Sequence, residues 1–493
     1  MIKLLTKSKY LLGLQCPKLL WVAVNDKERI PKPDEITQKK FDDGTFVGEL
    51  ATEVFEGGIS LADEEFKNNL EKTKKQLEKR VPIFEAGFIV DNLYSRADIL
   101  NPVGKDEWDI IEVKSATKVK DINLHDVAFQ KLVYQKAGLK IRNCYLMHIN
   151  NEYVLDNAIE PEELFAQTDI TEDIKPFEED LGQNIEKMFQ IIEGPEPEFS
   201  VDDLLTNEYD NICIDDFMAS LPENNIFDFY RMLTKKKVEL YKQGYKTMKD
   251  VPESIKLNEK QAIQKRLAHD GGIQLDKRGI KNFLNNLKYP IYYLDFETTN
   301  PILPKFKGMK PYQRIPFQFS CHIQSKSGKI RHVSFLANGT DDQRTKFLSK
   351  LKKILRKRGS ILVYNQGFEK GVLRESTNAF PRFKNWYEEG IEPRIMDLWD
   401  VFRNFYYYDP KQKGSASIKA VLPVMSNLSY KNLKDVKKGN QASYEWERVT
   451  FDSGIFKKEK QKIYKALKEY CKLDTLAEVE IMKKLNELVG ENE

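Results

Sequence analysis

Two acidic side chains stand near the end of an apolar segment in the last two-fifths of the chain. The segment Ile291-Tyr-Tyr-Leu-Asp295-Phe-Glu297 has the apolar run typical of a buried strand. Side chains two positions apart on a strand share one face at about 7 Å, so Asp295 and Glu297 would present two carboxylates to one point. Such clusters hold divalent cations for phosphodiester hydrolysis, where one cation activates water and another stabilises the leaving oxygen.

Later segments could complete this pair. Glu369 follows an apolar strand in Tyr364-Asn-Gln-Gly-Phe-Glu369, and Lys419 follows a Gly/Ser loop that opens a helix. Tyr470 and Asp474 lie four residues apart in the pattern of the final helix, so they would share one face. An Asp-x-Glu pair alone is equally well explained as a solvated strand end. The joint occurrence of these segments therefore favours a site.

A second charged set lies in the first third of the chain. Glu112 and Lys114 would share one face of a strand that begins at Trp108, and Asp98 precedes them on another apolar segment. Gln130 and Tyr134 would lie one helical turn apart. Carboxylates could bind metal here, and the lysine could position water or stabilise developing phosphate charge. A lone Glu-x-Lys pair could also be an exposed, salt-bridged strand edge.

The N-terminal set, taken in order along the chain, resembles the PD-(D/E)XK nucleases and in particular their RecB-like branch. The resemblance rests on Asp98, the Glu112-x-Lys114 pair and the Gln130-x-x-x-Tyr134 pair. It implies that Asp98 and Glu112 bind metal, with the Val113 carbonyl as a further candidate ligand. It also implies a metal ligand at Glu49 and a catalytic role for Lys114, supported by Gln130 and Tyr134.

The C-terminal set resembles the DEDD exonucleases of the DnaQ-like, RNase H-fold superfamily. This resemblance implies that four carboxylates bind two Mg²⁺ or Mn²⁺ ions and that Tyr470 orients or deprotonates the attacking water, giving 3′–5′ exonuclease activity. The four are Asp295, Glu297, Glu369 and Asp474. The family normally has Asp where this chain has Glu369, which moves the carboxylate by about 1.5 Å. We expect Asp397 to be a structural or helix-capping residue rather than a fifth ligand.

Nearly the whole chain resembles a family of uncharacterised bacterial and archaeal tandem nucleases. The implied fold is α/β throughout: a PD-(D/E)XK restriction-endonuclease-like domain over 1–160, a helical connector over 161–288, and an RNase H-like (DnaQ) domain over 289–493. The hydrophobic pattern predicts helices over 7–21, 124–137, 227–242 and 458–488, among others.

The five scattered cysteines indicate reduced thiols rather than a disulfide framework. Many RecB-like relatives hold an iron–sulfur cluster with four cysteines, but here Cys16 and Cys213 are the available candidates, and four thiolates are normally required. We expect no iron–sulfur cluster, and we expect Cys16 to be a buried helix residue.

Composition limits the kinds of partner. The 79 basic and 76 acidic residues leave a formal charge of +3, so any nucleic-acid surface must be local. The candidates for phosphate binding are the basic helix residues Lys352, Lys353, Arg356, Lys357 and Arg358, together with Lys419. Their alternative explanation is a solvated face. Apolar runs are short, which predicts a cytoplasmic protein without a membrane partner.

The sequence thus predicts a metal-dependent nuclease, a two-metal phosphodiesterase with two separate sites, with DNA favoured over RNA. Two alternatives stay open. One is an RNA-processing exonuclease, because DnaQ-like enzymes act on both polymers. The other is a nucleic-acid-binding or assembly protein in which one site has decayed, and Glu369 keeps this alternative open. Protein partners and oligomeric state are left undetermined.

Overall fold

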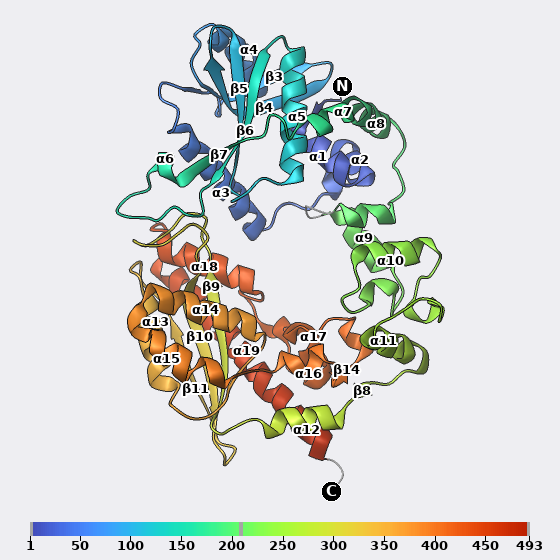
Figure 1. Cartoon of the computed structure of the whole chain (residues 1–493), viewed down its shortest axis with the longest axis vertical. Coiled ribbons are helices and arrows are strands. Elements are labelled where there is room, and N and C mark those ends of the chain that lie inside the picture. Colours follow the sequence, from blue (N-terminus) through green and yellow to red (C-terminus); the bar gives the residue numbers. More distant parts are fainter. Residues whose placement is uncertain (1–2, 207–210, 491–493) are drawn as a thin grey trace. The chain divides into compact units, whose positions relative to one another are not determined.

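The computed structural model describes residues 3–206 and 211–490 and has a mixed α/β fold (Figure 1). The chain forms two compact units: Met1–Leu221 with Ile302–Tyr312, and Pro222–Pro301 with Gln313–Glu493. The expected connector is divided between them, since 161–221 belong to unit 1 and 222–288 to unit 2. None of the helices in the described ranges has both the length and the apolar character needed to cross a bilayer.

Unit 1 is built on one mixed sheet. Its strands are β1 (Leu5–Thr6), β2 (Ile59–Ser60), β3 (Ile83–Val90), β4 (Leu93–Val103), β5 (Glu107–Lys114), β6 (Lys140–Ile149) and β7 (Phe165–Asp169). They are ordered β2-β3-β4-β5-β6-β7, and β1 pairs with β4. The pairs β3–β4 and β4–β5 are antiparallel, whereas β5–β6 is parallel. The parallel pair requires a crossover helix, which α5 (Asp121–Lys136) supplies.

Helices cover both faces of this sheet. Alternate residues of β5 point to opposite faces: Ile110 packs with α5 residues such as Val127, whereas Ile111 packs with Val47 of α3. The helices of unit 1 are α1 (Lys7–Gln15), α2 (Pro17–Asn25), α3 (Glu35–Thr52), α4 (Phe66–Leu77), α5, α6 (Pro161–Leu164), α7 (Lys175–Glu179), α8 (Leu181–Glu193) and α9 (Ile212–Ser220).

The helix predicted over 7–21 is two helices, α1 and α2, which meet at Cys16. Cys16 has the extended conformation φ −159°, ψ 115° and is followed by Pro17, the first residue of α2. A residue before proline is pushed away from helical backbone angles, and proline suits the first position of a helix. The expectation that Cys16 lies inside a helix is therefore wrong: it is buried, but it caps two helices.

Unit 2 contains a five-stranded sheet in the order β11-β10-β9-β12-β13. Its strands are β9 (Ile291–Thr299), β10 (Ile315–Gln324), β11 (Ile330–Leu336), β12 (Ile361–Val363) and β13 (Ile395–Asp397), and β8 (Gln274–Leu275) pairs separately with β14 (Tyr407–Tyr408). The pairs β9–β10 and β10–β11 are antiparallel, whereas β9–β12 and β12–β13 are parallel.

The two faces of β9 lie in different cores. Leu294 and Phe296 pack with α13 and α14, whereas Tyr293 packs with the long C-terminal helix α19. Asp295 and Glu297 alternate with Leu294 and Phe296, so they face α19. The helices of unit 2 are α10 (Thr234–Lys242), α11 (Glu259–Asp270), α12 (Lys277–Asn285), α13 (Arg344–Ile354), α14 (Gln366–Ala379), α15 (Lys384–Gly390), α16 (Trp399–Arg403), α17 (Ile418–Met425), α18 (Gly439–Phe451) and α19 (Lys457–Gly490).

Two predicted helices of unit 2 differ in outcome. The long helix predicted over 458–488 is confirmed as α19. The helix predicted over 227–242 is shorter: a 3₁₀ turn covers Ile226–Asp228, and α10 begins at Thr234. Between them Arg231 has a φ of 49°, in the left-handed region, so an α-helix cannot run through this stretch.

The segment Ile302–Tyr312 follows β9 in the sequence but packs in unit 1. Leu303 lies in the same apolar cluster as Val47, Ile111 and Val113. The Tyr312 hydroxyl donates a hydrogen bond to the carbonyl of Ser115, the residue after Lys114. Unit 1 is therefore completed by a segment that, in the sequence, connects β9 to β10 of unit 2.

Candidate active sites

A cluster of carboxylates lies inside unit 2 between β9 and α19. Ligand atoms of Asp295, Glu297 and Cys471 lie within 4.8 Å of one another. Glu369 of α14 and two acidic residues of α19, Asp474 and Glu478, extend the cluster, and each interacts electrostatically with Asp295. Glu297, Glu369, Asp474 and Glu478 are all buried. The structure thus brings together the four carboxylates predicted from the sequence.

Helix α19 presents one stripe of functional groups to this cluster. Tyr470, Asp474 and Glu478 follow each other at four-residue spacing, which places them on one helix face. All three side chains are buried. The helix is held against β10 by polar contacts as well, because Gln318 Nε2 donates to the Leu467 carbonyl at 2.9 Å. The position of the stripe is therefore fixed by the packing of α19 on the sheet.

Two tyrosines and a lysine border the cluster. The Tyr430 hydroxyl donates to Asp474 Oδ1 at 2.6 Å. The Lys419 Nζ lies 5.5 Å from the centre of the Tyr430 ring and 5.8 Å from that of Tyr470. A Cβ atom added to Gly439, the first residue of α18, would lie 3.7 Å from Glu297 Oε2 and 3.9 Å from the Tyr470 hydroxyl. The start of α18 therefore forms a wall of the site.

Burial and mutual repulsion of the carboxylates dominate the electrostatics of the cluster. Burial, together with the neighbouring acidic groups, raises the pKa of Asp295, Glu297, Glu369 and Glu478. Burial likewise raises the pKa of Asp474 to about 7, against the lowering effects of Tyr430 and Lys419. Glu369 Oε2, Asp474 Oδ2 and Glu478 Oε2 are buried without a hydrogen-bond partner. Buried oxygens left in this way are costly unless a cation or water satisfies them.

The chemistry of the donor set fits Mg²⁺ or Mn²⁺. These cations prefer carboxylate oxygens, which this cluster supplies from β9, α14 and α19. Cys471 is a poorer donor because burial and the surrounding carboxylates raise its pKa well above the usual range, and its thiol donates to Asp295 Oδ2 at 3.7 Å. A protonated thiol does not compete with carboxylates for a hard cation.

Asp397, at the end of β13, has a different role from the clustered carboxylates. Its two oxygens accept hydrogen bonds from the backbone N–H groups of Asn365 (2.9 Å), Gln366 (3.0 Å) and Trp399 (3.0 Å). Asn365 and Gln366 stand at the start of α14, which carries Glu369 in its first turn. These contacts are those of the capping residue expected from the sequence.

Unit 1 holds a second charged cluster, centred on Glu112. Glu112 is 1% exposed, and its carboxylate accepts from Lys114 Nζ and from Gln130 Nε2, at 2.5 and 2.7 Å. Asp98, on the neighbouring strand, accepts from the backbone N–H of Val113 at 2.7 Å. The structure thus brings together Asp98, Glu112, Lys114 and Gln130, as the sequence predicts.

Two further residues join this cluster. Asp126 of α5 accepts from Lys114 Nζ (2.9 Å) and from Gln130 Nε2 (3.0 Å). Lys7, the first residue of α1, donates to both Glu112 oxygens at 3.0 and 3.1 Å. Burial lowers the pKa of Lys7 and of Lys114, but the surrounding carboxylates outweigh it and raise both above the usual range. Both ammonium groups therefore stay charged at neutral pH.

Tyr134 lies beneath this cluster. It is fully buried, and its hydroxyl donates to the Ala86 carbonyl of β3 at 3.0 Å. It lies on α5 at four-residue spacing from Gln130 and Asp126, in one stripe. Its hydrogen bond to β3 fixes α5 against the sheet.

Glu49 does not join the Glu112 cluster. It is exposed on α3, whose buried residues Val47 and Ala51 pack with Ile111 and Val113. These β5 side chains belong to the face opposite that of Glu112. No hydrogen bond or ion pair between the Glu49 carboxylate and the cluster is found in the described residues.

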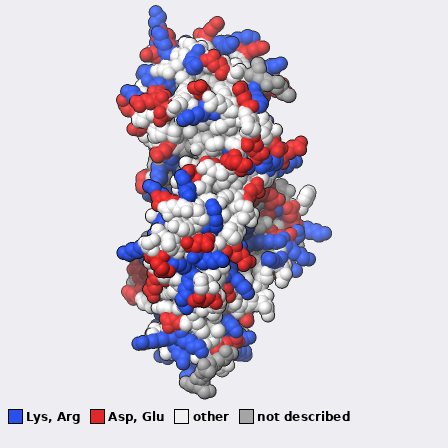
Figure 2. Space-filling view, turned by 90° about the vertical axis from the view of Figure 1, so that its right-hand side faces the viewer, with Lys and Arg blue, Asp and Glu red and all other residues white. Residues whose placement is uncertain are grey.

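The predicted basic residues fall into two groups. Lys352 and Lys353 are exposed on α13, and Arg356, Lys357 and Arg358 are exposed in the turn between α13 and β12. This turn and Glu369 lie at opposite ends of β12. Only Lys419 of the six borders the carboxylate cluster. On the face that Figure 2 displays, basic and acidic side chains are interspersed, and they do not form an extended basic patch there.

Cys16 and Cys213 lie together in a small apolar cluster with Leu19 and Val22. Cys16 Sγ accepts from the Leu19 backbone N–H at 3.4 Å. Hydrogen bonding to Cys213, with burial, raises the pKa of Cys16. The two thiols therefore contribute to the packing of α2 against α9.

Two of the residues that sequence analysis missed carry a recognisable signal. Asp126 precedes Gln130 by four residues, and Glu478 follows Asp474 by four, so each extends a helical stripe that was already recognised. Lys7 and Tyr430 carry no such signal, because neither shares an element or a spacing with the residues it contacts.

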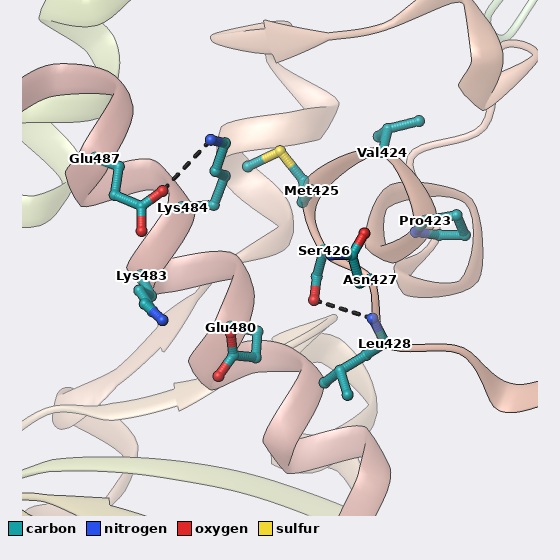
Figure 3. A pocket seen from close by; sticks show the side chains of 10 residues that line it. All are labelled: Pro423, Val424, Met425, Ser426, Asn427, Leu428, Glu480, Lys483, Lys484 and Glu487. Atoms are coloured by element: carbon teal, nitrogen blue, oxygen red, sulfur yellow. Dashed lines mark hydrogen bonds and ion pairs between the residues drawn. The ribbon is translucent and has the colours of Figure 1, made fainter. Parts of the chain in front are cut away.

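A pocket of about 640 Å³ lies further along α19 (Figure 3). It is lined by residues 423–428, which end α17 and follow it, and by four side chains of α19: Glu480, Lys483, Lys484 and Glu487. Lys484 pairs with Glu487 at 3.4 Å. None of the pocket's lining residues belongs to the carboxylate cluster.

Comparison with known proteins gives two matches. The family described as "Domain of unknown function (DUF2779)" matches residues 292–417, a range that includes Asp295, Glu297 and Glu369. An uncharacterised protein of Mycoplasma genitalium, MG366, is 25% identical over 233 residues, which are 43% of this chain and 34% of that protein. The chain thus spans about a third of the length of this curated relative. Neither description states an activity.

Proposed function

We propose that the chain is a metal-dependent nuclease that hydrolyses phosphodiester bonds, in DNA in preference to RNA, at two separate sites. The observation that carries the proposal is the set of five carboxylates in unit 2, several of whose buried oxygens have no hydrogen-bond partner. A cluster of this kind is costly without a compensating cation. Two-metal phosphodiester hydrolysis requires such a set of oxygen ligands.

The strand arrangement supports the finer fold assignment within this proposal. In unit 2, the order β11-β10-β9-β12-β13, antiparallel on one side of β9 and parallel on the other, supports an RNase H-like (DnaQ) fold. In unit 1, an antiparallel β3-β4-β5 meander followed by the parallel α5–β6 crossover supports a PD-(D/E)XK fold. In unit 2 Asp295 and Glu297 stand on the central strand β9 and face α19, and in unit 1 Glu112 stands on the interior strand β5 and faces α5.

In the proposed exonuclease site, Asp295, Glu297, Glu369 and Asp474 would hold Mg²⁺ or Mn²⁺, and Glu478 could add an oxygen. The cations supply activation of water and stabilisation of the leaving oxygen. Tyr470, with its hydroxyl beside the start of α18 and near the carboxylates, would orient the attacking water. Tyr430 holds Asp474 in one orientation through its hydrogen bond, and Lys419 supplies positive charge for a phosphate at the rim of the site.

In the proposed unit 1 site, Asp98 and Glu112 would bind the metal, and Asp126 is a third carboxylate within reach of the same ammonium groups. Lys114 would stabilise negative charge on the phosphate as the bond breaks. Gln130 orients Glu112 and Asp126 by donating to both. Tyr134 keeps α5 in position. Glu49 stays a proposed ligand on the family resemblance alone.

The test is a cleavage assay with end-labelled single-stranded DNA, duplex DNA and RNA, in Mg²⁺ or Mn²⁺. Asp295→Asn and Lys114→Ala should each abolish a different activity, and the double variant should be inactive. Glu389→Gln and Lys118→Ala, which change exposed residues, are the matched controls. Undiminished cleavage by the double variant would contradict the two-site proposal. Binding without cleavage of any polymer by the unaltered chain would instead identify a nucleic-acid-binding protein.

A further inference from the structure

Two ammonium groups of the chain contact Glu112: that of Lys114, which lies 2.5 Å from one carboxylate oxygen, and that of Lys7, which contacts both oxygens. Lys7 Nζ lies 3.0 and 3.1 Å from the two Glu112 oxygens. It also lies 3.9 Å from Asp98 Oδ1 and 3.9 Å from Asp126 Oδ1. Lys7 is therefore central to the three carboxylates that would hold a metal.

The hydrogen bonds of Glu112 leave no room for a cation beyond the two ammonium groups. Oε1 accepts from Lys7 and Lys114, and Oε2 accepts from Lys7 and Gln130. A carboxylate has about four lone-pair positions, so all of those on Glu112 are used. A Mg²⁺ ion bound to either oxygen at about 2.1 Å would have to remove one of these donors.

Among the three donors, Lys7 is the one that can leave with least disturbance. Gln130 is fully buried on α5, and Lys114 is on the same strand as Glu112. Lys114 Nζ lies 2.5 Å from Glu112 and 2.9 Å from Asp126, whereas the contacts of Lys7 with Glu112 are longer, at 3.0 and 3.1 Å. Lys7 follows the two-residue strand β1, and its long aliphatic chain can turn toward water. Its departure would leave three carboxylates against one ammonium group, a net charge that attracts a divalent cation.

We propose that Lys7 is a built-in counter-cation that closes the metal position of unit 1, so that a divalent cation binds at Glu112 only by displacing it. The inference deepens the proposed function, on which it rests for the existence of a metal site in unit 1. It assigns to Lys7 the control of metal entry. In the absence of metal, Lys7 thus holds the three carboxylates in place with its ammonium group.

The test measures Mn²⁺ binding to the full chain in which Asp295→Asn and Glu297→Gln disable the unit 2 site. In this parent, Lys7→Met removes the ammonium group but keeps a long side chain. We expect it to bind Mn²⁺ at least about tenfold more tightly than the parent, equivalent to about 1.4 kcal/mol. Lys9→Met is the matched control, because Lys9 lies on the same helix but donates to the Leu4 carbonyl. It should leave Mn²⁺ affinity unchanged.

Adding Glu112→Gln identifies the site that is measured. If Lys7→Met binds Mn²⁺ more tightly and Glu112→Gln removes that binding, the inference is supported. If Lys7→Met binds no more tightly than a parent whose binding depends on Glu112, the control by Lys7 is overturned while the metal site stands. If no form shows Glu112-dependent binding, both the inference and the metal site of unit 1 are overturned. The cleavage assay tests the unit 2 site separately.

A second measurement needs no substitution at Lys7. An amine-reactive reagent applied to the same parent should label Lys7 slowly without metal and faster as Mn²⁺ is added, because displaced Lys7 faces water. Peptide mass spectrometry compares this labelling with that of Lys9, which should not change. Equal labelling of Lys7 at all Mn²⁺ concentrations that saturate the Glu112 site would overturn the inference.

Discussion

At the scale of single residues, the carboxylates of unit 2 hold protons more tightly in the folded chain than they would in water. Burial raises their pKa values, that of Asp474 to about 7. Between the normal pKa of an aspartate and about 7, the folded state therefore binds more protons than the unfolded state. Under this condition the free energy of unfolding falls as pH rises.

We therefore predict that the chain without metal becomes less stable from pH 5 to pH 8. Thermal unfolding in EDTA measures this, and the unfolding temperature should fall over this range. Mg²⁺ or Mn²⁺ should largely remove the fall, because a bound cation favours the ionised carboxylates. Asp474→Asn is the control, since the amide does not titrate, and its fall with pH should be smaller. An equal fall in the variant would contradict the contribution of Asp474.

At the scale of elements, sequence reasoning predicted what lies on one strand or one helix face. Asp295 and Glu297 on β9, Glu112 and Lys114 on β5, and the faces of α5 and α19 all follow from local periodicity. The same periodicity leads to Asp126 and Glu478, which the sequence analysis did not name.

What periodicity could not predict depends on tertiary packing. Lys7 reaches Glu112 because β1 pairs with β4, and Tyr430 reaches Asp474 from the loop between α17 and α18. Glu49 was assigned from its place in a motif, whereas α3 packs on the opposite face of β5 from Glu112. In each case a contact between distant parts of the chain determines where the residue lies. Local periodicity in a single sequence does not reveal which distant segments pack together.

The junction of β12, β13 and α14 gives a prediction at this scale. Asp397→Ala removes the acceptor for three backbone N–H groups, which should lower the free energy of unfolding by roughly 2–4 kcal/mol. The proposed exonuclease activity should fall as well, because α14 carries Glu369. Chemical denaturation and the cleavage assay provide the two readouts. Asp397→Asn keeps one acceptor oxygen and should lose less stability. Equal stability of Asp397→Ala and the unaltered chain would show that these contacts are dispensable.

At the scale of the whole molecule, the order of the sequence and the division into units do not coincide. Ile302–Tyr312 belongs to unit 1, although β9 before it and β10 after it belong to unit 2. Leu303 packs with residues of α3 and β5, and Tyr312 contacts the Ser115 carbonyl directly after Lys114. The apolar core beside the proposed unit 1 site therefore includes residues of 302–312. Cutting the sequence after residue 221 would wrongly assign these residues to unit 2.

We predict that Leu303→Ala destabilises unit 1 rather than the sheet in which its neighbours in sequence lie. The cavity should cost about 2–5 kcal/mol. Hydrogen exchange followed by mass spectrometry should show faster exchange in α3 and β5, with β9 and β10 little changed. Leu233→Ala, at a side chain that is 77% exposed, is the control and should change neither. Faster exchange confined to β9 and β10 would contradict the assignment of this segment.

The placement of Ile302–Tyr312 also sets an order of events during synthesis. When residue 221 has left the ribosome, the first unit still lacks the piece that covers α3 and β5, and residues 222–301 must be made before that piece follows. At the usual rate of 5–20 residues per second, the wait lasts roughly 5–20 seconds. During that interval the side of the cluster around Val47, Ile111 and Val113 that Leu303 covers stays exposed to water, so we expect chaperones to bind the nascent chain before residue 303 is made.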